Sequence, residues 1–240
     1  MGMKLSGVVP WGRNIDEYRE MFLLTDSNMR KKIAGFGDGP ASFNFQATCA
    51  GSNVVSVDPI YQFSKAELEN RIQEVRGIVL KQMSENMDNY VWDKITSLQQ
   101  LEDVRMSAMR MFLDDYARGR QESRYINHEL PDRLPFPDSS FDIGLSSHFL
   151  LLYTALGYDF HIAAITEMLR VCKEIRIFPL CDLDSHASEM IEDVIAYFRN
   201  SYDVQISPTG YEFQKGANRL LIIRHIQNDS DYSRGAALFP

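Results

Sequence analysis

The 240-residue chain lacks several features that mark specialised classes of protein. No apolar run approaches the ~20 residues needed to span a bilayer, and the first residues lack the apolar core of a signal peptide. No internal repeat or low-complexity segment is present. We therefore expect a cytoplasmic protein without a membrane partner.

Cysteine is also scarce. The three cysteines stand far apart and form neither a CxxC pair nor a zinc-ligand spacing: Cys49, Cys172 and Cys181. This pattern predicts buried free thiols in a reducing compartment and no structural metal.

Basic residues are outnumbered. Lysine and arginine total 25 against 33 acidic residues, which gives a net charge of −8. Because an acidic surface repels phosphate backbones, nucleic acid is not an expected partner. Hydrophobic residues make up 45% of the chain, enough for a sizeable core, and the length favours one domain over residues 1–240. The sequence leaves the oligomeric state open.

The first half of the chain begins with a strand, a glycine turn, a helix and a second strand. Strands are expected at 32–36 and 53–57, with a helix in 40–50 between them. This unit is typical of a parallel α/β sheet. Residues 64–120 then show only helical patterns, far longer than a simple crossover needs, and predict an inserted helical cap over the carboxyl edge of the sheet.

Strands return in the second half. They are expected at 123–127, 141–146 and 174–179, with helices around 162–172 and 190–198. The last two strands, 202–206 and 219–225, have no helix between them and predict a terminal antiparallel hairpin. The predicted fold class is therefore α/β: a Rossmann-like, seven-stranded, mostly parallel sheet with helices on both faces.

A nucleoside pocket is indicated by two features that follow the first two strands. The turn after the first strand contains Gly35, Gly37 and Gly39, and Asp58 ends the second strand. Glycines allow close approach of a ligand to the backbone, and a carboxylate at Asp58 can accept both ribose hydroxyls. The NAD fingerprint fails because Pro40 replaces its third glycine and has no N–H for a diphosphate.

Several motifs together resemble class I S-adenosylmethionine-dependent methyltransferases. They are GFGDGP, VVSVDPIY, LPFPDSSFD with the strand that follows it, and EMLRV, over roughly residues 31–63 and 123–226. The terminal hairpin is also typical of that family. Within it, the chain looks like an uncharacterised bacterial branch that begins with a PWGR segment.

The resemblance implies S-adenosylmethionine as cofactor and assigns residues to it by position. Gly37 and Gly39 would pass its methionine part, Asp58 would hold the ribose, and Ser147 would face the methyl group. The expected cofactor-binding residues are Gly35, Phe36, Gly37, Asp38, Gly39, Asp58, Pro59, Ile60, Glu129, Leu130, Ser146 and Ser147.

The chain departs from the family pattern at three places. Gly35 stands where an acidic residue is common, Ala41 replaces the third motif glycine, and 171–174 lack the usual glycine pair. The first departure removes one partner of the methionine ammonium group. Asp38 or an N-terminal residue could substitute for it.

Candidates for chemistry are few, because methyl transfer requires no particular catalytic residue. His148, directly after the fourth strand, is the candidate base, and Tyr153 could hydrogen-bond an acceptor. The competing interpretation is a loop or helix-packing histidine for His148 and core packing for Tyr153. Arg13 is the candidate substrate-binding residue, since N-terminal segments often close over the cofactor in this family and its guanidinium could reach the cofactor's carboxylate.

Two further clusters favour unremarkable interpretations. Asp182, Asp184 and His186 alternate as metal ligands could, but a polar loop is the preferred interpretation. The arginines of 105–124 interleave with acidic residues and predict a solvated, salt-bridged face rather than an anion site.

We therefore expect transfer of a methyl group from S-adenosylmethionine to a small-molecule acceptor. Two alternatives remain open: an NAD(P)-dependent oxidoreductase, and a non-catalytic protein that binds a nucleoside or S-adenosylmethionine for regulation.

Overall fold

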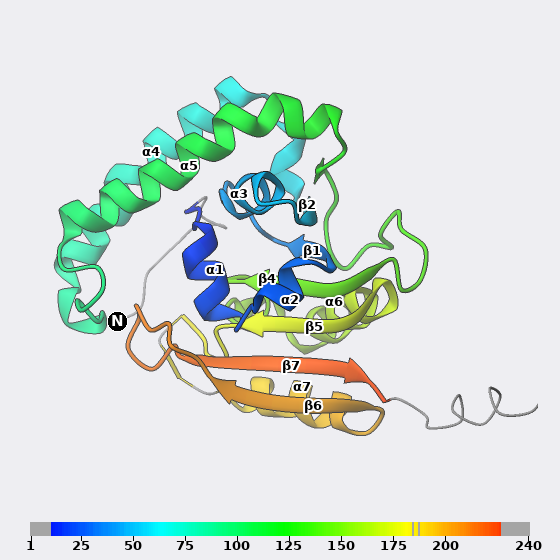
Figure 1. Ribbon diagram of the computed structural model, residues 1–240. Coiled ribbons are helices and arrows are strands. Elements are labelled where there is room, and N and C mark those ends of the chain that lie inside the picture. The colour runs from blue at the N-terminus through cyan, green and yellow to red at the C-terminus, as the bar shows by residue number, and fades with distance from the viewer. Residues whose placement is uncertain (1–10, 184, 187, 227–240) are drawn as a thin grey trace, which may run out of the picture.

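One seven-stranded sheet organises the protein (Figure 1). The computed structural model describes residues 11–183, 185–186 and 188–226. The strands lie in the order β3-β2-β1-β4-β5-β7-β6, all neighbours pairing in parallel except those of β7, which pair antiparallel. They are β1 (Lys32–Phe36), β2 (Asn53–Val57), β3 (Tyr125–Ile126), β4 (Phe141–Ser147), β5 (Cys172–Phe178), β6 (Tyr202–Pro208) and β7 (Arg219–His225). The predicted fold class is confirmed.

The strand positions agree closely with the sequence patterns, except at the edge of the sheet. The third strand spans two residues rather than the five expected, because Ser123 has a φ of +56° and still belongs to the turn that ends the preceding helix. The terminal hairpin runs in register from Tyr202 opposite His225 to Pro208 opposite Arg219.

Helices cover both faces of the sheet because its side chains alternate between two cores. Ala34 and Phe36 pack with α6 (Tyr158–Val171) and α7 (Glu189–Arg199) on one face. Ile33 packs on the other face with α1 (Ile15–Met21) and α3 (Phe43–Cys49). The remaining short helices are α2 (Asp26–Met29), η1 (Pro59–Gln62), η2 (Met87–Asn89) and η3 (Thr154–Leu156).

The segment between β2 and β3 forms a long helical hairpin of α4 (Lys65–Glu85) and α5 (Leu98–Gln121), which arches past α3 in Figure 1. Each helix begins at a side-chain cap, Ser64 for α4 and Ser97 for α5. The tip of the hairpin joins the β6–β7 loop, where the backbone N–H of Val91 donates to the carbonyl of Phe213 over 2.8 Å.

Two expectations about side chains are wrong. Cys49 is exposed, although Cys172 and Cys181 are buried, and all three are free thiols. Arg105 and Arg124 are buried in ion pairs, not solvated, because each reaches inward from α5 or its end to a buried carboxylate. No helix among the described residues is long and apolar enough to cross a membrane.

The two glycines Gly144 and Gly77 provide a matched test of this packing. A Cβ at Gly144 in β4 would lie 2.8 Å from Cys172 Sγ and 3.1 Å from Phe36, whereas one at Gly77 in α4 would meet nothing within 4 Å. We expect Gly144→Ala to lower the free energy of unfolding by about 1–3 kcal/mol through overpacking.

The control, Gly77→Ala, should raise the same free energy by about 0.5–1 kcal/mol, because alanine is the better helix former. Urea unfolding monitored by circular dichroism measures both. Equal effects of the two substitutions would contradict the packing around β4.

Candidate functional site

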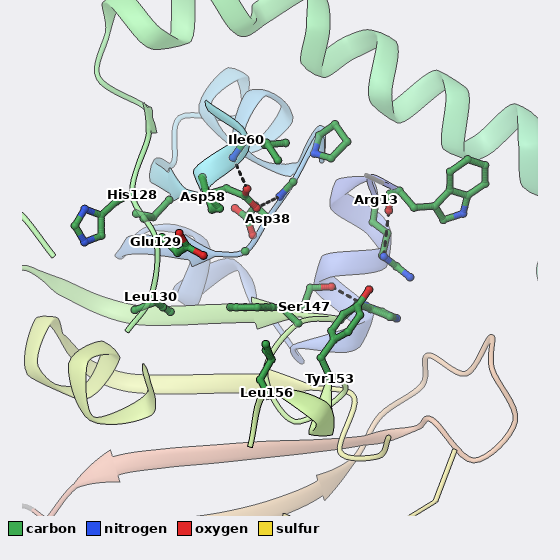
Figure 2. Close-up of a pocket in the computed structure, with 18 of the residues that line it drawn as sticks. Arg13, Asp38, Asp58, Ile60, His128, Glu129, Leu130, Ser147, Tyr153 and Leu156 are labelled. Carbon is green, nitrogen blue, oxygen red and sulfur yellow. Dashed lines mark hydrogen bonds between the residues drawn. The ribbon is translucent and has the colours of Figure 1, made fainter. Parts of the chain in front are cut away.

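A cavity of about 320 Å³ lies at the carboxyl edge of the sheet, where the chain order reverses between β1 and β4 (Figure 2). Ligands of open α/β sheets bind at this switch point. The cavity is lined by Trp11, Arg13, Tyr18, Gly37, Asp38, Gly39, Pro40, Val57, Asp58, Pro59, Ile60, His128, Glu129, Leu130, Ser147, His148, Phe149, Tyr153, Leu156 and Phe160.

The glycine turn after β1 forms the floor of the cavity. Gly37 and Gly39 have φ values of +71° and +57°, which L side chains rarely adopt. A Cβ at Gly37 would also lie 2.7 Å from the ring of Phe149. The turn therefore requires glycine at both positions, and Phe149 packs against it at Gly37 while the space at Gly39 is open.

Asp58 holds this turn to the end of β2. Its carboxylate accepts hydrogen bonds from the backbone N–H of Gly39 over 2.8 Å and of Ile60 over 2.9 Å. Burial raises the pKa of Asp58 to about 6. The two N–H groups lower this pKa, and the charge of Glu129 raises it further, but burial is the largest effect. Asp58 thus orders the turn and presents a buried carboxylate to the cavity.

Asp38 lies beside it in an unusual position. A Cβ on Gly35 would overlap the Asp38 carboxylate, so this carboxylate fills the space that a side chain at position 35 would occupy. It accepts hydrogen bonds from the hydroxyl of Tyr18 over 2.8 Å and of Ser56 over 2.6 Å. Burial raises the pKa of Asp38 to about 6, and the nearby charge of Asp58 adds to that increase.

The Asp38 contacts continue into a buried polar network that reaches α5. The Asn44 amide donates to Ser56 Oγ over 3.1 Å, and its oxygen accepts from Arg124 over 2.8 Å. Arg124 in turn makes two 2.7 Å bonds to the Asp115 carboxylate. The network connects the glycine turn to the helical hairpin without a break.

His148 occupies the opposite side of the cavity, at the end of β4. It has a φ of +54°, and its backbone N–H donates to the carbonyl of Phe178 over 2.7 Å. Its Nδ1 lies 2.8 Å from the Ser147 hydroxyl. Burial and the positive charges of Arg13 and Arg105 hold the pKa of His148 well below its usual value, so the imidazole is neutral at pH 7.

Arg13 reaches the same side from the segment before α1. Its carbonyl accepts from the backbone N–H of Ser42 over 3.0 Å, which holds the segment on the glycine turn. Behind it, Glu17 accepts two 2.6 Å bonds from Arg105, and the Tyr211 hydroxyl donates to Glu17 over 3.0 Å. These contacts join α1, α5 and the β6–β7 loop.

Most residues expected at the site line this cavity: Arg13, Gly37, Asp38, Gly39, Asp58, Pro59, Ile60, Glu129, Leu130, Ser147, His148 and Tyr153. Gly35, Phe36 and Ser146 do not line it, because Asp38 covers Gly35 and the other two side chains are fully buried. Their assignments and the role of every lining residue stay predictions.

Sequence reasoning missed the apolar wall of the cavity. Phe149, Leu156 and Phe160 line it, as do Trp11 and Tyr18 from the N-terminal segment. Phe149, Leu156 and Phe160 stand in a largely apolar segment, and such a segment is as typical of the hydrophobic core as of a pocket wall. Only their position just after β4 could have separated them from the core.

The metal-like cluster after β5 gains no support. Among the described residues, no group of three or more His, Cys, Asp and Glu side chains could hold a metal ion. Asp182 Oδ1 instead accepts from the backbone N–H of His186 over 2.8 Å, as in a polar turn. Asp184 lies outside the described residues.

Comparison with known proteins places the chain in a family. No family model matches it. It is 34% identical, over 224 residues, to the uncharacterized protein MJ0045 of Methanocaldococcus jannaschii, and the alignment covers 92% of this chain and 98% of that protein. The chain belongs to the same family as MJ0045. This family includes a protein from an archaeon, beyond the bacterial branch expected from the sequence.

Solved structures with a similar course of the chain are more distant. The magnesium protoporphyrin IX methyltransferase ChlM of Synechocystis PCC 6803, solved with bound SAM, is 13% identical with a TM-score of 0.43, over 84% of this chain and 73% of that one. PH0226 of Pyrococcus horikoshii OT3 is 14% identical with a TM-score of 0.43, over 82% of each chain. A SAM-dependent methyltransferase of Aquifex aeolicus is 10% identical with a TM-score of 0.39, over 88% and 93%. Identities and TM-scores this low show no activity for this chain.

The overlap of positions 35 and 38 predicts strong coupling between them. Gly35→Ala should lower the free energy of unfolding by about 1–3 kcal/mol, since its methyl group displaces the Asp38 carboxylate. In an Asp38→Ala background the space is free, so the same substitution should cost less, with a coupling of at least about 1 kcal/mol. Urea unfolding of the four proteins measures it. Additive effects would contradict the placement of Asp38 over Gly35.

Proposed function

We propose that this member of the MJ0045 family is a class I methyltransferase that moves a methyl group from S-adenosylmethionine to a small molecule. The observation that carries the proposal is Asp58. Its buried carboxylate ends β2 and is fixed to the bare glycine turn by Gly39 N–H, beside a cavity at the switch point of the sheet. Such a carboxylate is suited to the two hydroxyls of a ribose.

The lining residues fit the rest of this cofactor. Asp38 offers a carboxylate for the methionine ammonium group in the space that Gly35 leaves free. Ile60 and Leu130 offer apolar walls for the adenine, and Glu129 an acceptor for its amino group. When bound, S-adenosylmethionine supplies a methyl group on a positively charged sulfur that departs as a thioether.

The alternative cofactor NAD fits less well. Pro40 lines the cavity in the turn before α3, where a diphosphate needs backbone N–H donors. Proline has none. The oxidoreductase is therefore the weaker proposal, and a regulatory protein without turnover remains the other alternative.

A small acceptor is favoured by the size of the cavity and by the net charge of the chain. The cavity is at the small end of the roughly 300–1,000 Å³ typical of ligand pockets, which leaves little room beside a cofactor. The chain carries a net charge of −8, which opposes a nucleic acid. Its unpaired cysteines are consistent with the cytoplasm.

His148 is suited to receive the proton that the acceptor loses. It is neutral, and in the tautomer whose Nδ1–H donates to the Ser147 hydroxyl, Nε2 has the lone pair that can take the proton. Asp58 and Asp38 would hold S-adenosylmethionine, which would supply the methyl group and leave as a neutral thioether, while His148 would take the proton that the acceptor loses.

The helical hairpin would act on the site indirectly. Among the described residues, none from α4 or α5 lines the cavity. Arg105 of α5 instead binds Glu17 and so holds α1 and the segment of Arg13 at the cavity's edge. We therefore propose that the insertion holds the N-terminal segment over the edge of the cavity and does not itself cover the cavity.

Binding of S-adenosylhomocysteine tests the cofactor directly. Calorimetry should show binding to the native protein, weakened by about tenfold or more in Asp58→Ala and Asp58→Asn, because the ribose loses its carboxylate. Asp203→Ala, at an exposed carboxylate on β6, is the control and should leave affinity unchanged. Thermal unfolding of each variant verifies the fold.

Binding of NADH but not S-adenosylhomocysteine to the native protein would overturn the proposal in favour of an oxidoreductase. Full affinity in both Asp58 variants would remove Asp58 from the ribose contact.

Cofactor affinity should also depend on pH. The pKa values of Asp38 and Asp58 are raised to about 6 in the free protein, and the ligand binds their ionised forms. Below pH 6 binding must release protons, so affinity should fall as pH falls, approaching about tenfold per pH unit for each group. Calorimetry between pH 5 and about 8 in buffers of different ionisation enthalpy measures affinity and proton release together. A flat profile would show that neither carboxylate needs to ionise.

A further inference from the structure

The charges at the α1 side of the cavity do not balance. Two guanidinium groups, Arg13 and Arg105, lie close enough for each to influence the other. A single carboxylate, Glu17, is near enough to neutralise these charges, and both of its oxygens accept 2.6 Å hydrogen bonds from Arg105. Among the described residues, no carboxylate forms an ion pair with Arg13. One positive charge is left over.

The neighbouring titratable groups do not supply the missing negative charge. Burial raises the pKa of Tyr211, and the charge of Glu17 raises it further, so its hydroxyl stays neutral. His148 is neutral as well. Asp38 and Asp58 face the cavity from the glycine turn and β2, and Figure 2 shows Arg13 apart from Asp58, on the side of Ser147 and Tyr153.

Arg13 also has unused hydrogen-bonding capacity. Among the described residues, its contacts are few: Nη1 donates to the Trp11 carbonyl over 3.2 Å, and the Tyr211 hydroxyl is a second, neutral acceptor nearby. Its Nε is buried without an acceptor, and so is the indole N–H of Trp11, whose side chain lines the same cavity. Arg13 as a whole is half-buried, but buried N–H donors without acceptors are costly unless a ligand pairs with them.

We propose that the methyl acceptor carries an oxyanion, a carboxylate or a phosphate, that binds the guanidinium of Arg13. This inference rests on the proposed methyl transfer and names the class of its substrate. The bound anion neutralises the surplus charge and anchors the acceptor beside His148, on the side of the cavity away from the ribose carboxylate. A guanidinium suits either oxyanion because it offers two parallel N–H donors.

The cofactor's own carboxylate is the competing partner for Arg13, and the tail of the cofactor separates the two cases. S-adenosylhomocysteine carries this carboxylate, whereas 5′-methylthioadenosine lacks the whole amino-acid tail. We expect Arg13→Gln to leave the affinities for both nucleosides unchanged. A loss of about tenfold for S-adenosylhomocysteine alone would assign Arg13 to the cofactor and overturn the proposal.

Simple anions test the acceptor side. Inorganic phosphate and acetate are titrated separately into protein saturated with S-adenosylhomocysteine, at constant ionic strength with chloride, and followed by calorimetry and thermal shift. We expect one of them to bind the native complex weakly, to lose about tenfold in affinity in Arg13→Gln, and to lose less in Arg13→Lys, which keeps the charge. The anion that binds identifies the carboxylate or the phosphate class.

Arg71→Gln, at an exposed arginine of α4, is the matched control and should change nothing. Failure of either anion to bind the saturated complex, or equal binding in Arg13→Gln, would overturn the proposal while leaving the methyltransferase intact. Failure of S-adenosylhomocysteine itself to bind the native protein would instead overturn the proposed function.

Discussion

The ion pair between Glu17 and Arg105 is the contact on which the form of the cavity depends. It is buried, and it joins α1, which follows the segment of Arg13, to the helical hairpin, while Tyr211 adds the β6–β7 loop. Removing one partner of such a pair leaves a buried charge uncompensated, at a cost of about 3–5 kcal/mol. Three segments far apart in sequence are thereby joined at one point, beside the segment that carries Arg13.

The sheet and its glycine turn were predictable because their signals are local. The apolar stretch before Gly35, the acid at Asp58 and the helical spacing of 64–120 each depend on neighbouring residues. The antiparallel hairpin of β6 and β7 followed from the absence of a helix between two strands. Methyl transfer itself remains a proposal, since the resemblance of short motifs led to it and the geometry supports it.

The buried arginines could not be predicted, because their partners are distant in sequence. Arg105 stands 88 residues from Glu17, and Arg124 is bound to Asn44 across 80. Alternating charges on a helix look the same whether they face water or a second segment. The apolar wall of Phe149 and Phe160 was missed for the related reason that composition does not separate a pocket from a core.

The place of Asp38 has a consequence for how relatives of this protein are recognised. An acidic residue at position 35 and the carboxylate of Asp38 would occupy one space, so the acid can stand at either position but not at both. Moving it from strand to turn therefore requires two changes made together. A relative with an acid at position 35 is therefore expected to carry a smaller, uncharged residue at position 38.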